Sequence, residues 1–246
     1  MKKKDIALHH HIAALNAAFS AAGFRATLSG DAASYRAAVA AIPDYHIYSP
    51  LDDSLADFGA GMLWVGLEDA QGRMVAVEAG RVIDAPAKAG GLNAVLNSRV
   101  FGRVLPVVDR PPPVNLTGRL AYLGGAWVDP DLRGRRVMSL TLKLTIAHLV
   151  RCYGIDAVFG FVRSKHAGLA LAPEGYGFTS ATALDLMYLP GEAAADLLCL
   201  VWTDPGILAE RWSLPADYQI GPAAARGKTG KKPSERRSAG PSPRHL

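Results

Sequence analysis

The sequence predicts a mixed α/β domain in which helices cover a single sheet. The main observation is the order of patterns over residues 120–162: an apolar strand, a turn containing a glycine, a helical run and a near-continuous apolar strand. A strand, a crossover helix and a strand form a parallel pair with a right-handed connection. The chain has 246 residues, half of them hydrophobic, which is enough to bury a sizeable core.

The first fifty residues predict two helices and a short strand. Apolar residues recur at helical spacing from Ile6 to Ala22, and a glycine ends this alanine-rich run. Phe24–Leu28 fits a short strand. Asp31 then has the side chain of an N-cap, for a helix that reaches Ala41 and ends before a proline.

The next segment predicts a β-hairpin and a long excursion. Met62–Glu68 and Met74–Asp84 have strand character, and Asp69–Arg73 between them contains the Asp and Gly of a tight turn. The pattern breaks down over Ala85–Thr117, where we expect one short helix near Leu92–Val100. Loops of this length in compact domains often serve as lids or substrate walls.

The second half of the chain predicts the parallel pair and two further strands. Leu120–Val128 and Ile155–Val162 are the paired strands, and the second is apolar enough to be buried on both faces. The helix between them is Val137–Cys152, with apolar residues on one side. Thr182–Leu189 and Ala195–Trp202 complete the predicted sheet.

The turn before the long helix carries the main functional signal. The first four N–H groups of a helix have no intrahelical partner and lie at the positive end of its dipole. Gly134 precedes them, and Arg133, Arg135 and Arg136 accompany them. These groups together suit a pyrophosphate. The same residues also fit a capped surface helix with a solvated basic end, and the pattern alone leaves both interpretations open.

The order of these motifs resembles that of the GNAT acetyltransferase superfamily. Residues 128–137 read Val-Asp-Pro-Asp-Leu-Arg-Gly-Arg-Arg-Val, and the chain later reads Gly-Tyr-Gly-Phe at 175–178. The family signature is a valine, a proline two residues on, an Arg-Gly-x-Gly-x-Gly/Ala turn that opens the central helix, and a later Gly-Phe. The resemblance is strongest over Leu120–Phe178 and looser over Met62–Trp202. The chain departs from the family at Arg136 and Met138, where glycine or alanine is usual.

The resemblance implies a particular sheet and donor site. The GNAT-like sheet is mixed and mostly antiparallel, with a central parallel strand pair splayed around acyl-CoA, and here it would carry an extra N-terminal helix. The backbone of Val128 would pair with the pantetheine arm of acetyl-CoA, the acyl donor. The pyrophosphate would be held by the backbone amides of Arg133, Gly134, Arg135, Arg136, Val137 and Met138.

The resemblance also places the catalytic candidates. His166 stands where family members often have asparagine, and Pro173 stands where many have the tyrosine that protonates the departing thiolate. Tyr176, three residues on, is our candidate for this acid. Acetylating an amine also needs a base for the amine's proton. Glu78 on the second hairpin strand and His166 are the main candidates for the base, with His148 as a further one.

The predicted function is transfer of an acyl group, taken as acetyl, from acetyl-CoA to a small-molecule or peptide amine. The amine would attack directly within a ternary complex. The alternative is a non-catalytic acyl-CoA-binding or interaction module on the same fold. No metal site is predicted, because the three consecutive histidines at 9–11 point in different directions on a helix. No apolar run approaches the ~20 residues needed to cross a bilayer, so we expect a cytoplasmic protein. The acceptor and the oligomeric state stay open.

The net charge of +5 belongs to the C-terminal tail. Residues 226–246 carry seven basic side chains against one glutamate, a net +6, which leaves the rest of the chain at −1. Such a tail has too few apolar residues to offset its ordering entropy. It can contact nucleic acid or anionic lipid, although a solvated extension is the favoured interpretation. We therefore expect an N-terminal helical extension packed on the core (1–50), an acyltransferase domain (51–220) and a disordered basic tail (221–246).

Overall fold

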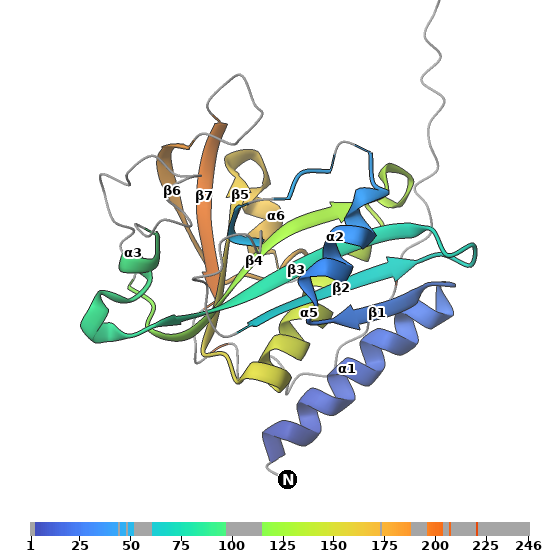
Figure 1. Cartoon of the computed structure of the whole chain (residues 1–246), viewed down its shortest axis with the longest axis horizontal. Coiled ribbons are helices and arrows are strands. Elements are labelled where there is room, and N and C mark those ends of the chain that lie inside the picture. The colour runs from blue at the N-terminus through green and yellow to red at the C-terminus, as the bar shows by residue number, and fades with distance from the viewer. Residues whose placement is uncertain are drawn as a thin grey trace, which may run out of the picture.

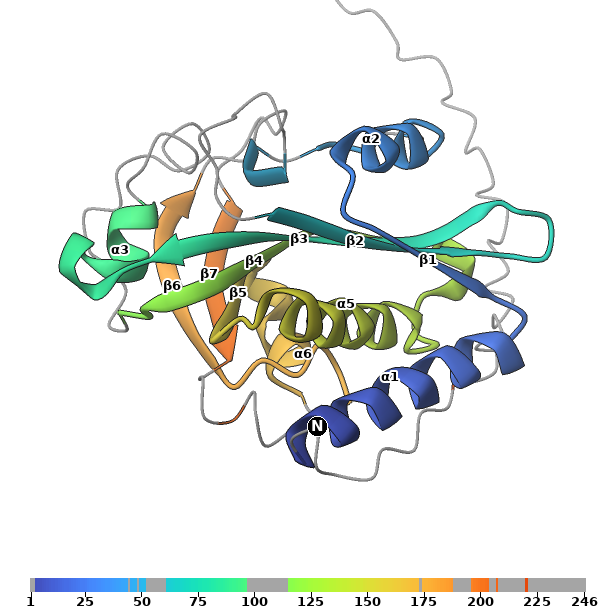
Figure 2. The same cartoon turned by 60° about the horizontal axis from the view of Figure 1, so that its bottom comes forward.

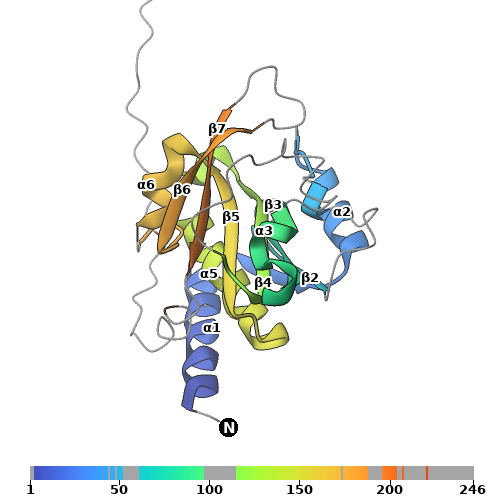
Figure 3. The same cartoon turned by 90° about the vertical axis from the view of Figure 1, so that its left-hand side faces the viewer.

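Seven strands form one sheet at the centre of the computed structural model. The structure describes residues 3–43, 45–47, 49–51, 61–96, 115–172, 174–187, 196–203, 207 and 220. Within them the strand order is β1-β2-β3-β4-β5-β7-β6. Helices α1, α5 and α6 lie on one face, and α2 and α3 lie on the other (Figures 1, 2 and 3).

The N-terminal segment contributes two helices and one strand of the sheet. Helix α1 (Lys3–Ala21) buries Leu8, Ile12, Leu15 and Phe19 in the core on the α5 side of the sheet. Strand β1 (Arg25–Ser29) is an edge strand, antiparallel to β2. Helix α2 (Ala32–Ala40) begins at Asp31, whose carboxylate accepts from the N–H groups of Ala33 and Ser34. The predicted helices and strand of this segment are confirmed.

The predicted hairpin is β2 (Gly61–Glu68) and β3 (Met74–Ala85), paired antiparallel. Its turn is held by Asp69, whose Oδ1 accepts from the backbone N–H groups of Gln71 and Arg73. Beyond β3 come the 3-10 turn η2 (Ala87–Ala89) and α3 (Gly91–Leu96). The rest of the predicted excursion, residues 97–114, lies outside the described residues.

The central parallel pair is β4 (Gly118–Val128) and β5 (Ala157–Arg163), connected by α5 (Val137–Tyr153). Their pairing runs only from Leu120 with Ala157 to Leu123 with Gly160. Both strands continue beyond these residues, so the pair splays at its carboxyl end. The predicted strand, crossover helix and strand are confirmed, together with the splay.

The remaining elements close the other half of the sheet. The short helix α6 (Ala167–Leu171) follows β5 after the 3-10 turn η4 (Ser164–His166). Strand β7 (Asp196–Thr203) pairs antiparallel with β5, and β6 (Ser180–Met187) pairs antiparallel with β7. The predicted mixed, mostly antiparallel sheet with one parallel pair is therefore confirmed. Among the described helices none is both long and apolar enough to cross a membrane.

Each face of the sheet carries its own apolar core. The α5-side core lies under α1, α5 and α6 and includes Phe19, Val65, Leu123, Leu140 and Leu144. The α2-side core includes Tyr35, Trp64, Tyr122, Leu120 and Phe159. Helix α5 packs between the sheet and α1, and its N-terminus lies beside the end of β4.

Strand β4 contains a bulge, and beyond it the alternation of side chains between the two sides of the sheet is shifted by one residue. Val77 pairs with Trp127, whereas Ala79 pairs with Gly124, so β4 has one extra residue here. Before the bulge Leu123 packs in the α5-side core, and after it Val128 packs there while Trp127 packs on the α2 side. Leu123 and Val128, which would face opposite sides of a regular strand, therefore face the same side of the sheet. One inserted residue explains this.

Candidate active site

A cavity of about 580 Å³ lies where the parallel pair splays. Its walls are the end of β4, the start of α5 and the segment after α6. Eight of the ten residues predicted for the site line it: Val128, Arg133, Gly134, Arg136, Val137, Met138, His166 and Tyr176. Arg135 and Glu78 are not in the lining. The structure therefore brings together residues from 128 to 176 around one space.

The turn that opens α5 lines this cavity, and within it the N–H groups of Arg133 and Arg135 already donate to Pro130 O and Leu132 O. It begins with the 3-10 turn η3 (Pro130–Leu132), in which the Asp129 carboxylate accepts from the N–H of Asp131. Gly134 has a φ of 78°, a left-handed conformation that suits glycine, and a Cβ added there would meet nothing within 4 Å. The first turn of α5 starts at Val137 and lines the cavity. Unpaired N–H groups at a helix start attract anions.

Arg136 departs from ordinary backbone geometry. Its φ of 65° makes it the only non-glycine residue with positive φ in the described part of the chain. Its side chain lines the cavity, and its Nε is buried without a hydrogen-bond partner among the described residues. A strained backbone with an unsatisfied buried donor is typical of a site that a ligand completes. Here the donor suits an anion.

A loop from the other side of the cavity is tied to α5 by Ser139. Its hydroxyl donates to the carbonyl oxygen of Glu174 at 2.8 Å and also to that of Gly175. Tyr176 follows in a turn, with its N–H donating to Leu169 O at 3.2 Å. Helix α6 has already ended at Leu171, so Tyr176 lies outside regular helix and on the cavity wall. Pro173, which the sequence analysis compared with the family's acid, lies outside the described residues.

Tyr176 on the cavity wall lies within electrostatic range of the buried carboxyl of Glu78. Burial, and then the nearby Glu78 carboxyl, raise the pKa of the Tyr176 phenol above its ordinary value. Complete burial raises the pKa of Glu78 well above its ordinary value. The Oε2 atom of Glu78 has no hydrogen-bond partner among the described residues. Glu78 lies between Val77 and Ala79, directly opposite the β4 bulge. In both groups burial favours the protonated form.

The two histidine candidates lie in different surroundings. His166 is exposed at the end of η4 and lies on the cavity rim. His148 is buried on α5 and does not line the cavity, and burial, followed by the charge of Arg151, lowers its pKa. His166 is thus the histidine that a substrate in this cavity would meet.

Several lining residues had not been predicted. They include a polar anchor, an aromatic side chain and parts of the loop after α6, namely Ala126, Trp127, Leu132, Ser139, Leu169, Ala172, Glu174 and Gly175. Two of these regions had signals in the sequence. The Gly124-Gly125 pair inside a strand indicates a bulge or a close backbone approach. Ser139 is a polar residue between the apolar Met138 and Leu140 in the first turn of α5.

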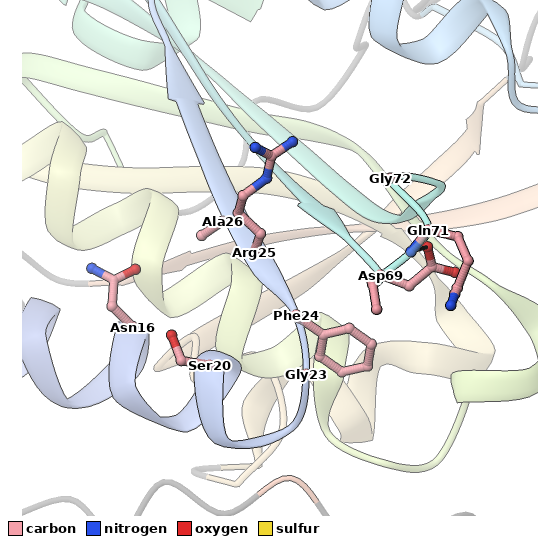
Figure 4. A pocket seen from close by; sticks show the side chains of 10 residues that line it. Asn16, Ser20, Gly23, Phe24, Arg25, Ala26, Asp69, Gln71 and Gly72 are labelled. Carbon is pink, nitrogen blue, oxygen red and sulfur yellow. Dashed lines mark hydrogen bonds between the residues drawn. The ribbon is translucent and has the colours of Figure 1, made fainter.

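A second, more open concavity of about 760 Å³ lies between the end of α1, β1 and the β2–β3 turn (Figure 4). Its charged groups already have partners within the protein. Arg25 forms an ion pair with Glu68, and the Asp69 carboxylate serves its own turn and Arg73. We assign no chemistry to it.

Comparison with known proteins gives likeness in structure only. No protein-family model and no curated protein sequence matches the chain. Among solved structures, FeeM, an N-acyl amino acid synthase from uncultured soil microbes, is 15% identical, with 77% of this chain and 92% of that chain covered and a TM-score of 0.43. NAA60 of Arabidopsis thaliana, in complex with acetyl-CoA, is 13% identical, with 73% and 97% covered and a TM-score of 0.43.

A third similar structure is the spermidine/spermine N-acetyltransferase SpeG from Vibrio cholerae, in mutant forms. It is 9% identical, with 77% of this chain and 98% of that chain covered and a TM-score of 0.45. By its strand order, its splayed parallel pair and its crossover helix, the chain has the GNAT-like fold that the sequence predicts.

Proposed function

We propose that the protein is an acyltransferase that moves an acetyl group from acetyl-CoA to an amine. The observation that carries the proposal is the cavity at the splayed parallel pair, which is lined by the start of α5 on one side and by the Tyr176 phenol on the other. A thioester with a pyrophosphate at its far end needs both features. Binding, orientation and one proton transfer are then supplied by the chain itself.

The donor fits the residues of the α5 turn and of β4. The amides at the start of α5 and the guanidinium of Arg136 suit the pyrophosphate, with Arg133 at the exposed edge. Beyond Leu123 the side of β4 that faced β5 has lost its ladder partner. The backbone around Val128 can therefore pair with the amides of a pantetheine arm, as a neighbouring strand would.

Tyr176 is proposed as the acid of the reaction. The amine nitrogen attacks the thioester carbonyl carbon, the C–S bond breaks, and the thiolate takes the phenolic proton. A raised pKa keeps the phenol protonated until the thiolate forms. The Glu78 carboxyl also raises the pKa of Tyr176, which helps the phenol to keep its proton until the thiolate forms.

For the base we prefer His166 to Glu78. Burial raises the pKa of the Glu78 carboxyl and so favours its protonated form, which has no free lone pair of the carboxylate to offer an amine's proton. We therefore propose Glu78 as part of the acid side of the site. His166, exposed on the cavity rim, is the proposed base for the amine's proton. The acceptor is proposed to be a small-molecule or peptide amine in the cytoplasm.

Calorimetric titration with acetyl-CoA, followed by thiol release against a panel of amines, tests the proposal. We expect saturable 1:1 binding and release of CoA thiol with at least one class of amine. No binding of acetyl-CoA would refute the donor assignment. Binding without thiol release from any amine would instead favour the non-catalytic acyl-CoA-binding module.

A further inference from the structure

Two tyrosines from the N-terminal segment hold the bulge of β4. The hydroxyl of Tyr45 donates to the carbonyl oxygen of Gly125, eighty residues away in sequence. The hydroxyls of Tyr35 and Tyr45 lie 2.8 Å apart. Because the single proton of Tyr45 is used on Gly125, Tyr35 is the donor between the two. We call this chain of Tyr35, Tyr45 and the Gly125 carbonyl the tyrosine clamp.

The clamp fits the bulge closely. Gly125 has a φ of 71°, and a Cβ added there would lie 2.5 Å from both tyrosine hydroxyl oxygens. Only glycine combines that backbone conformation with that space. A bulge removes a residue from the strand ladder, so its backbone groups need partners elsewhere. The clamp supplies one for the Gly125 carbonyl.

The clamp is anchored in the α2-side core, where Tyr35 is buried and against which Tyr45 packs. Tyr35 is fully buried on α2, and its ring centroid lies 6.1 Å from that of Trp64 on β2. The indole N–H of Trp64 donates to Ser34 Oγ at 3.1 Å. Helix α2 is thereby attached to the sheet on the face opposite α5 (Figure 2).

The clamped bulge is continuous with the cavity wall. Ala126, Trp127 and Val128 follow Gly125 directly and line the cavity. This part of β4 no longer pairs with β5, so within the described part of the chain β3 is its strand partner. The bulge also decides which side chains face the cavity, because it exchanges the two faces of β4. A shift of the Gly125 carbonyl therefore moves the wall against which a bound donor would lie.

We propose that Tyr35 and Tyr45 are positioning residues, which set the cavity wall of β4 against the reacting thioester without touching it. The inference rests on the proposed acyl transfer. Loss of the clamp is then expected to lower kcat strongly and to leave the Kd for acetyl-CoA nearly unchanged. The groups proposed to hold the pyrophosphate belong to the start of α5 and not to the clamp. Small displacements of positioned groups reduce rates strongly.

The test compares Tyr45→Phe and Tyr35→Phe with a matched control, Tyr153→Phe. Tyr153 also donates its hydroxyl to a strand carbonyl, Met62 O at 3.0 Å, beside a glycine, yet it does not line the cavity. For Tyr45→Phe we expect about tenfold lower kcat, an unchanged Kd for acetyl-CoA, and faster amide hydrogen exchange in a peptide covering residues 123–128. For Tyr153→Phe we expect wild-type kcat and wild-type exchange in that peptide.

Three outcomes would count against the inference or its premise. Exchange in Tyr45→Phe equal to that of the control overturns the clamp, and faster exchange with unchanged kcat overturns its positioning role. Wild-type protein that releases no thiol with any amine refutes the proposed function instead, while the exchange measurement still decides the clamp. Tyr35→Phe removes only the outer hydroxyl and is expected to lie between the wild type and Tyr45→Phe, so it replaces Tyr45→Phe if that variant does not fold.

Discussion

Replacing Arg136 by glycine is expected to change stability and donor binding in opposite directions. Arg136 holds a left-handed backbone with a φ of 65°. That conformation costs a non-glycine residue about 1–2 kcal/mol, whereas glycine adds about 0.5–1 kcal/mol of backbone entropy cost. Arg136→Gly should therefore raise the free energy of unfolding by about 0.5–1 kcal/mol, which corresponds to a Tm increase of about 1–4 °C.

The same substitution is expected to weaken binding of acetyl-CoA. The guanidinium lines the cavity, and its buried Nε has no hydrogen-bond partner among the described residues. A charge-assisted hydrogen bond to a phosphate contributes about 1.5–3 kcal/mol. Its loss corresponds to a roughly 10- to 100-fold increase in Kd. Thermal unfolding measures the first effect and calorimetric titration measures the second.

Arg135→Gly is the matched control for this prediction. Arg135 is adjacent in sequence and carries the same charge, but it has no positive φ and lies outside the cavity lining. Glycine there should lower the Tm slightly and leave the Kd for acetyl-CoA near the wild-type value. The reasoning is refuted if Arg136→Gly binds acetyl-CoA as tightly as the wild type, or if it is less stable than the wild type.

Three further predictions concern the α5 turn, the acid and the buried histidine. Gly134→Val should fold, because a Cβ at this position meets open space. It should raise the Kd for acetyl-CoA by more than about tenfold, because the φ of 78° at this position disfavours a β-branched residue. An unchanged Kd in calorimetry would contradict this prediction. Tyr176→Phe should lower kcat by roughly 10²-fold, measured as thiol release, with little change in Kd; unchanged turnover would remove Tyr176 from the mechanism. Burial and the charge of Lys143 lower the pKa of His11 from 6.5 to about 4. Between pH 6.5 and pH 4 the unfolded chain therefore binds more protons than the folded protein. The free energy of unfolding should then fall by about 1–3 kcal/mol as the pH is lowered from 6.5 to 4. Denaturant unfolding at several pH values checks this, and His11→Gln should flatten the profile.

The order and type of the elements were predictable from the sequence because local patterns determine them. The helix of residues 137–153 has an apolar stretch, a glycine at its C-cap and a glycine-containing turn before it. The β2–β3 hairpin follows from the Asp and Gly of its turn. The cavity-lining turn at Arg133–Met138 was predictable for the same reason, since an anion site at a helix start needs only consecutive residues.

The rest of the site depends on contacts between distant residues. Glu78 resembles an ordinary strand residue in sequence, and only the folded structure shows that its side chain is buried and close enough to Tyr176 to raise the pKa of the phenol. The tyrosine clamp joins residues 35, 45 and 125, and no local pattern relates them. The position of Tyr176 depends on Ser139, whose hydroxyl fixes the loop after α6.

Irregular backbone surrounds the candidate site on three sides. Gly125 in the bulge, Gly134 and Arg136 before α5, and Gly177 after Tyr176 all have positive φ values. Each turns the chain at a wall of the cavity or beside one, whereas the strands and helices that support these turns are regular. Three of the four positions are glycines, for which the conformation costs little. Arg136 is the exception, and natural chains keep such local conflicts mainly where function requires them. The conformational cost at Arg136 is therefore the best physical reason to expect an anionic ligand at the start of α5.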